Sequence, residues 1–212
     1  MRIFVAGATG RVAEFLMKDI LAQGHEVIAG ARRPEAVIQA EGLTSVAMDL
    51  KGPVDALVDL VKGVDAIYFT AGSRGKDLLQ TDAFGAVKLV QAAEAAGVKR
   101  FIMLSSLDAT KPANWGIYEE VGLMDYIIAK YFADQYLVHQ SKLAYTILQP
   151  TILVEAEAAD GKVALNHLVS KQNTIPNVAK VLASLVEADN TIGKIITMSD
   201  GDQPVAEALA TI

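Results

Sequence analysis

A glycine turn near the start of the chain constrains the fold more than any other feature. Gly7-Ala8-Thr9-Gly10 separates an apolar run, Arg2–Ala6, from a segment, Arg11–Gln23, in which apolar residues recur at helical spacing. The first glycine permits a tight bend, and the second lets the backbone approach a ligand. N–H groups at the start of the helix are suited to phosphate. The order strand, turn, helix therefore predicts a phosphate cradle, with a plain structural turn as the alternative. The predicted contacts are Gly7, Thr9, Gly10, Arg11 and Val12.

Short apolar runs alternate with helical patterns as far as Pro150. Because parallel neighbours need crossover connections, this alternation predicts a Rossmann-type, doubly wound α/β fold, with a mainly parallel sheet and helices on both faces. The expected strands are Arg2–Ala6, Glu26–Ala29, Ser45–Met48, Asp65–Thr70, Arg100–Leu104 and Ala144–Leu148. The expected helices are Arg11–Gln23, Pro34–Ala40, Val54–Val61, Leu78–Ala96 and Gly122–Gln140.

The chain after Pro150 is too short to fold alone. It predicts a helix over Asn177–Ala188, a strand over Lys194–Met198 and a helix over Pro204–Ala210. We therefore expect one domain over residues 1–212, in which residues 151–212 form a small C-terminal cap on the substrate side.

Composition narrows the choice of partners. With 19 basic and 25 acidic residues the formal net charge is −6, which argues against nucleic acid. Cysteine is absent, and the three histidines have no carboxylate at ligand spacing, so no metal site is expected. No apolar run approaches the roughly 20 residues of a membrane span. These features predict a cytoplasmic protein that binds a small molecule rather than a membrane, as a monomer or a homodimer.

Two arginines follow the second expected strand, where an NAD-specific site carries an acidic residue. The guanidinium groups of Arg32 and Arg33 suit a 2′-phosphate, which favours NADP(H) over NAD(H). Two solvated loop arginines are the alternative. Asp49 and Leu50 follow the third strand, where an adenine edge would lie, although Asp49 could equally cap a helix.

These motifs resemble those of the atypical short-chain dehydrogenase/reductase families, specifically the small NAD(P)H-binding, NmrA-like and flavin-reductase-like group. The matching segments are Gly7–Arg11, Ala31–Pro34, Asp49-Leu50, Asp65–Phe69, Gly85–Ala93, Val98–Phe101, Leu104–Ser106 and Tyr145–Pro150. The likeness covers nearly the whole chain and is specific for fold and cofactor rather than for substrate.

The resemblance implies further contacts with the cofactor at the ends of later strands. They are Thr70, Ala71 and Gly72 after the fourth strand, Leu104, Ser105 and Ser106 after the fifth, and Pro150 and Thr151 after the sixth. One departure is clear, because the family usually has Arg-Pro where this chain has Gln149-Pro150. That difference puts an ionic role at this position in doubt.

A tyrosine and a lysine four residues apart form the candidate catalytic pair. Tyr126 and Lys130 share one helix face, so the lysine could stabilise a tyrosinate and contact the cofactor ribose. Tyr126 could then act as a general acid or base toward an oxygen that Ser106 also binds. The alternatives are a chance pairing on an amphipathic helix, or a role for Tyr131 or Tyr136 instead.

Three functions remain open at this stage. The first is an NADP(H)-dependent oxidoreductase, a reductase that transfers hydride to a small carbonyl, quinone or flavin. The second is a non-catalytic redox sensor of the NmrA-like type. The third, a sugar-nucleotide epimerase, is disfavoured because the tail after Pro150 is short. The substrate would be selected by the weakly patterned loops Leu107–Val121 and Thr151–Ile175.

Overall fold

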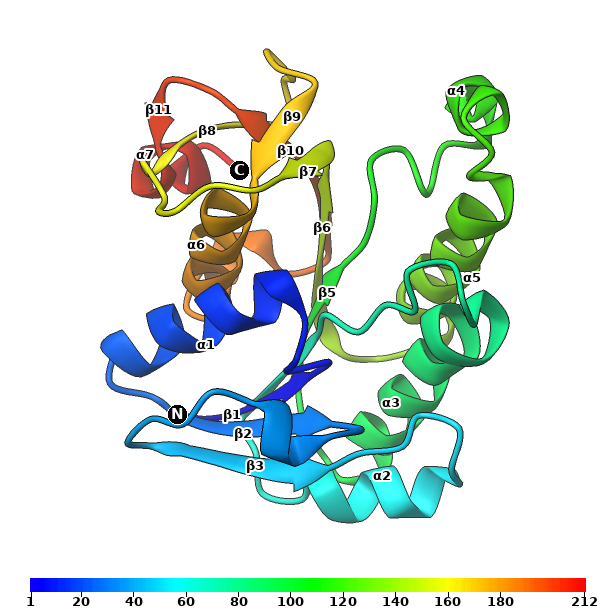
Figure 1. The fold of residues 1–212 in the computed structure, drawn as a ribbon, viewed down its shortest axis with the longest axis vertical. Coiled ribbons are helices and arrows are strands. Elements are labelled where there is room, and N and C mark those ends of the chain that lie inside the picture. Colours follow the sequence, from blue (N-terminus) through cyan, green and yellow to red (C-terminus); the bar gives the residue numbers. More distant parts are fainter.

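The computed structural model describes residues 1–212 and is built around a nine-stranded sheet (Figure 1). The spatial order of the strands is β11-β8-β10-β6-β5-β4-β1-β2-β3. All neighbouring strands from β10 to β3 in this order pair in parallel. The predicted Rossmann-type, mainly parallel sheet is therefore confirmed. The strands are β1 (Arg2–Ala6), β2 (Glu26–Ala31), β3 (Leu43–Ala47), β4 (Ala66–Phe69), β5 (Arg100–Leu104), β6 (Ala144–Pro150), β7 (Ile152–Val154), β8 (Lys162–Leu165), β9 (Gln172–Thr174), β10 (Lys194–Asp200) and β11 (Gln203–Pro204).

Helices cover both faces of the sheet (Figure 1). One core cluster joins β1 and β2 to α1 and α6, and a second joins the sheet to α2, α3 and α5. The helices are α1 (Arg11–Ala22), α2 (Val54–Val61), α3 (Phe84–Ala95), α4 (Gly116–Glu120), α5 (Met124–Gln140), α6 (Ile175–Leu185) and α7 (Val205–Ala210).

Alternation along β1 explains how one strand serves both cores. Ile3 and Val5 face the α1 and α6 side, whereas Phe4 and Ala6 face the α2 and α3 side. All four are fully buried. A strand that is apolar at every position is what a sheet covered on both faces requires.

The chain after Pro150 extends the sheet as well as covering part of it. β10 pairs with β6 in parallel, and β8 then pairs antiparallel with β10. β7 and β9 form a separate two-stranded sheet. The apolar side chains of α6 join the core cluster that contains α1, so both ends of the chain contribute to one core.

Some predicted elements differ from those in the structure. Only Pro34–Ala36 of the expected helix Pro34–Ala40 is helical, as a single 3₁₀ turn, because the chain becomes extended at Val37, whose side chain is buried. The expected helix Leu78–Ala96 opens with π-helical turns over Leu78–Ala83 before α3 begins. The two weakly patterned loops contain α4, β7, β8 and β9. None of the helices combines the length and apolar composition that crossing a bilayer requires.

Candidate functional site

A groove with a volume of about 1310 Å³ lies at the carboxyl ends of the parallel strands. Its walls come from the turn after β1, the segments after β2, β3 and β4, and the inner face of α5. The chain runs outward from β1 through β2 to β3, and then crosses back to β4 on the other side of β1. Such a switch point is where open α/β sheets bind ligands.

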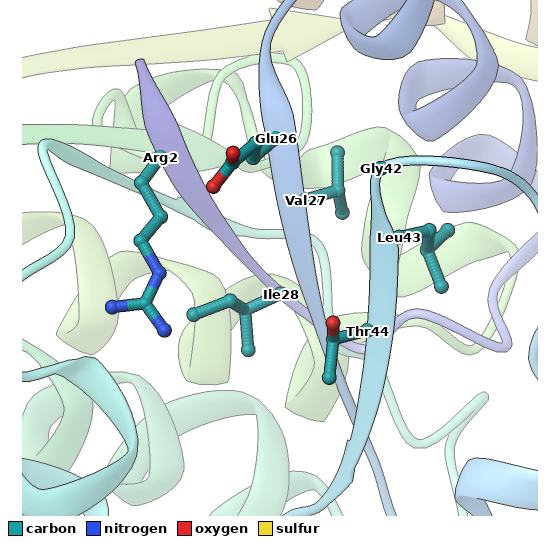
Figure 2. A pocket seen from close by; sticks show the side chains of 7 residues that line it. All are labelled: Arg2, Glu26, Val27, Ile28, Gly42, Leu43 and Thr44. Atoms are coloured by element: carbon teal, nitrogen blue, oxygen red, sulfur yellow. The ribbon is translucent and has the colours of Figure 1, made fainter.

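A smaller hollow of about 300 Å³ lies near the amino-terminal ends of β1, β2 and β3 (Figure 2). Figure 2 shows Arg2 and Glu26, the first residues of β1 and β2, among the side chains around it. None of the predicted site residues lines this hollow. The larger groove is therefore the candidate site.

The turn after β1 approaches the end of β4 very closely. Gly7 has a φ of +88°, and a Cβ atom there would lie 2.5 Å from the Cα atom of Ala71. The glycine is thus required by backbone conformation and by packing. The N–H of Gly7 donates to the carbonyl of Gly30, which joins the turn to β2.

The first turn of α1 presents free backbone donors. Gly10 caps this helix without a side-chain hydrogen bond, and its own N–H donates to the carbonyl of Gly7. The N–H groups of Arg11, Val12 and Ala13 have no backbone acceptor. A helix start that has free N–H groups and no side-chain cap has the electrostatic character of an anion site.

The groove is strongly basic although the chain as a whole is acidic. Seven of its lining residues are cationic and two are acidic, whereas the formal net charge of the chain is −6. The cationic residues are Arg11, Arg32, Arg33, Lys51, Arg74, Lys76 and Lys130. A groove of this charge is suited to an anionic ligand.

The cations of the groove differ in their protein partners. Arg32 and Arg33, which follow β2, are exposed and form no ion pair, whereas Lys51 lies 2.8 Å from Asp77. A hydrogen bond from Lys51 lowers the pKa of Asp77, and the charge of Arg32 contributes to the same shift. Arg11 pairs with Glu155, which follows β7. Arg74, after β4, is likewise exposed and forms no ion pair, so three guanidinium groups of the groove are free to bind a ligand.

Asp49 and Leu50 lie in the groove, as do Thr70, Ala71 and Gly72. The Asp49 carboxylate also accepts a hydrogen bond from the backbone N–H of Lys51, so it stabilises the turn after β3. The helix that follows, α2, begins after Pro53 and has no side-chain cap, so Asp49 does not cap it. The adenine contact stays a prediction.

The inner end of the groove contains three of the predicted polar residues, Ser105, Tyr126 and Lys130. The Lys130 ammonium is buried, donates to the carbonyl of Leu104 at 3.2 Å and lies 5.9 Å from the centre of the Tyr126 ring. Tyr131 instead packs on Trp115, and Tyr136 accepts a hydrogen bond from Gln91. Tyr126 is therefore the tyrosine of α5 that reaches the groove.

Ser106, Pro150 and Thr151 do not line the groove. The Ser106 hydroxyl lies 3.4 Å from that of Tyr118, which donates to the carbonyl of Leu107. Thr151 donates to Asn173 through both its N–H and its hydroxyl. Ser105, rather than Ser106, is thus the serine that lines the groove, and it is also largely buried.

Asp134 is a buried carboxylate that sequence reasoning did not select. Its Oδ2 accepts hydrogen bonds from Ser105 at 2.7 Å and from the side-chain amide of Gln149 at 3.0 Å. Burial raises the pKa of Asp134 to about 6, while these two bonds and the charge of Lys130 oppose the rise. Asp134 follows Tyr126 by eight residues and Lys130 by four, so all three share one face of α5, and this spacing could have identified it from the sequence.

Comparison with known proteins decides the family. The family described as NAD(P)H-binding matches residues 7–189. The chain belongs to the NAD(P)H-binding family. This confirms the predicted relationship to the small NAD(P)H-binding group of atypical short-chain dehydrogenase/reductases.

Similar proteins extend over the whole NAD(P)H-binding chain. The uncharacterized sugar epimerase YhfK of Bacillus subtilis is 35% identical, with 99% of each chain covered. The crystal structure of the oxidoreductase ylbE from Lactococcus lactis has 43% identity and a TM-score of 0.96, covering 100% of this chain and 96% of that one. A putative NAD-dependent epimerase/dehydratase from Bacillus halodurans has 32% identity, a TM-score of 0.88 and complete coverage of both chains.

The residues of the groove fit the ligand class of the NAD(P)H-binding family. Free amides at the start of α1 suit a pyrophosphate, and the cationic wall suits further negative charge. The family description covers both NADH and NADPH, and the proteins similar to this chain include some named as epimerases and one named as an oxidoreductase.

Proposed function

We propose that this protein is an NADP(H)-dependent oxidoreductase that reduces a small carbonyl, quinone or flavin acceptor. The observation that carries the proposal is that two adjacent arginines without ion-pair partners, Arg32 and Arg33, lie on the groove wall directly after β2. β2 ends at Ala31, and no acidic residue stands at its end to bind a ribose 2′-OH. A planar guanidinium group donates in a geometry that matches phosphate.

The remaining residues have roles that follow from their places in the groove. Gly7, Gly10 and the amides of Arg11 and Val12 would hold the pyrophosphate. Thr9, Thr70, Ala71 and Gly72 would border it, with Asp49 and Leu50 near the adenine. When bound, the reduced nicotinamide supplies a hydride to the acceptor. Leu104, Ser105 and Lys130 would lie beside the nicotinamide end, and Pro150 and Thr151 would support this end from behind the lining residues.

Tyr126 is the group proposed to exchange a proton with the acceptor. It lies in the groove with the Lys130 ammonium close to its ring. Lys130 would keep the phenol ring of Tyr126 in place beside the nicotinamide end of the groove. Ser106 would act on the acceptor only after a rotation away from Tyr118.

Two measurements on the purified protein test the proposal. Isothermal titration compares NADP, NADPH, NAD and NADH, and a spectrophotometric screen follows NADPH oxidation with quinones, flavins and small carbonyls. Micromolar binding of NADPH, weaker binding of NADH and turnover with any acceptor are expected. Preference for NADH would contradict the role given to Arg32 and Arg33. Binding of NADPH without turnover would instead favour the redox sensor.

A sugar epimerase is the second candidate, because YhfK carries that description and matches 99% of the chain. The tail after Pro150 disfavours it, since three strands and two helices of that segment complete the sheet and its cover. An epimerase would interconvert nucleotide sugars without net consumption of cofactor. Proton NMR of UDP-glucose, UDP-galactose and their N-acetyl forms, incubated with protein and NAD, detects this activity directly.

A further inference from the structure

Ser105 belongs both to the groove and to a buried polar network behind it. The residue lines the groove at the end of β5, and its hydroxyl donates to the buried carboxylate of Asp134. Gln149 donates to the same carboxylate oxygen and also to the hydroxyl of Thr110, at 3.3 Å. Asp134 is completely buried, and its second oxygen has no hydrogen-bond partner.

The positions of the protons on Ser105 and Asp134 determine which hydrogen bonds a ligand can form with them. A serine hydroxyl has one proton and two lone pairs, and an ionised carboxylate can only accept. The single Ser105 proton is directed at Asp134, so a ligand that reaches this hydroxyl meets lone pairs alone. Lys130 is the charged group that faces Asp134, and its ammonium is held by the carbonyl of Leu104. Burial raises the pKa of Asp134 only to about 6, so at neutral pH the carboxylate is ionised and cannot return the proton.

We infer that Asp134 is a positioning residue that makes the Ser105 hydroxyl a hydrogen-bond acceptor for a ligand N–H donor in the groove. The donor with the right chemistry is the primary carboxamide of a nicotinamide ring, whose NH₂ group needs an acceptor. This inference rests on the proposed function, because it requires the nicotinamide end of the cofactor beside Ser105. It assigns Ser105 to holding the ring in one orientation rather than to donating a proton to the acceptor substrate.

The test compares NADP with its 3-acetylpyridine analogue, in which a methyl ketone replaces the carboxamide and the N–H donors are lost. One hydrogen bond predicts that the wild-type protein binds NADP about three- to tenfold more tightly than the analogue. In Asp134→Ala the Ser105 hydroxyl is free to turn and donate, so this ratio should fall toward one. Asp134→Asn keeps a carbonyl oxygen for Ser105 and should restore most of the ratio.

Two controls separate positioning from structural damage. Adenosine 2′,5′-bisphosphate lacks the nicotinamide, so its affinity should be the same in the wild type and in Asp134→Ala. Ser105→Ala removes the hydroxyl and leaves Asp134 intact, and it should lower the analogue ratio to the same extent. It carries the test if Asp134→Ala fails to fold.

The possible outcomes distinguish this inference from the proposed function. NAD and its own 3-acetylpyridine analogue are titrated in parallel. Preference for NAD would contradict the proposed NADP specificity, but the ratio of the affinities for NAD and its analogue would still test the role of Ser105. Equal ratios in the wild type and in Ser105→Ala would overturn the inference. If Asp134→Ala bound both the bisphosphate and NADP more weakly, while the ratio of affinities for NADP and its analogue stayed unchanged, Asp134 would have only a structural role. Failure of the wild type to bind any dinucleotide would overturn both proposals.

Discussion

The hydroxyl of Ser105 donates to the carboxylate of Asp134 at 2.7 Å, across 29 residues of sequence and directly behind the wall of the groove. The bond joins the end of β5 to the middle of α5. It brings a completely buried acid next to Lys130, the lysine of the candidate catalytic pair. The polar end of the groove is therefore tied to a titratable group inside the protein.

Asp134 should make folding stability depend on pH. Burial raises its folded-state pKa to about 6 from an unfolded value of 3.8. Below pH 4 the group is protonated in both states, and above pH 6 the folded state bears the cost of a buried charge. The contribution of Asp134 to the free energy of unfolding therefore decreases as pH rises from about 4 to about 6. Relative to Asp134→Asn, the wild type should gain on the order of 1 kcal/mol between pH 8 and pH 5 in urea unfolding.

Asp125→Asn is the matched control for this measurement, because Asp125 is exposed at the start of the same helix. The same pH series on Asp125→Asn measures the effect of replacing an exposed carboxylate. A wild type and an Asp134→Asn variant with parallel pH profiles would contradict the buried ionisation.

Arg32→Ala should reduce the affinity for NADPH while leaving that for NADH nearly unchanged. A hydrogen bond between charged groups contributes about 1.5–3 kcal/mol, which corresponds to roughly 10- to 100-fold in affinity. The loss should shrink at high salt, because the site is exposed and its charges are screened. Arg2→Ala is the control, since this exposed arginine lines the small hollow at the opposite ends of the strands (Figure 2). Equal losses for NADPH and NADH would show that Arg32 does not recognise the 2′-phosphate.

Gly7→Ala should destabilise the fold far more than Gly24→Ala. Both glycines have left-handed φ angles, +88° and +82°, which cost an alanine about 1–2 kcal/mol. Only at Gly7 would the added Cβ also collide with backbone atoms, 2.5 Å and 2.6 Å from Ala71, whereas nothing lies within 4 Å at Gly24. Urea unfolding of the two variants measures the difference. Similar midpoints would mean that the turn after β1 moves away from Ala71 at little cost.

Tyr126→Phe should lower turnover by about 10²- to 10⁴-fold if Tyr126 exchanges a proton with the acceptor. NADPH affinity should change little, because the ring and its contact with Lys130 remain. Tyr118→Phe is the comparison, since that hydroxyl binds Leu107 and Ser106 and lies outside the groove lining. Steady-state NADPH oxidation with an accepted substrate gives both rates. Normal turnover in Tyr126→Phe would remove the phenol from the mechanism and leave positioning of the hydride donor as the main contribution.

The sequence alone determined the sheet and the location of the groove, because local patterns carried that information. Short apolar runs alternating with helical periodicity require a parallel sheet with covered faces. The turn from Gly7 to Gly10 and the arginines after β2 lie next to the strands that position them, so their places on the groove wall followed from the strand assignment.

Only the tertiary structure decided which polar side chains meet at the inner end of the groove. Asp134 accepts hydrogen bonds from Ser105, directly after β5, and from Gln149 of β6, and no local pattern encodes such contacts. Ser105 and Ser106 are adjacent in sequence, but the backbone at the end of β5 directs one hydroxyl to Asp134 and the other to Tyr118. The short strands after Pro150 depend on pairing with β10 and β9 rather than on their own periodicity. Long-range pairing and burial set these contacts, and both are properties of the folded chain.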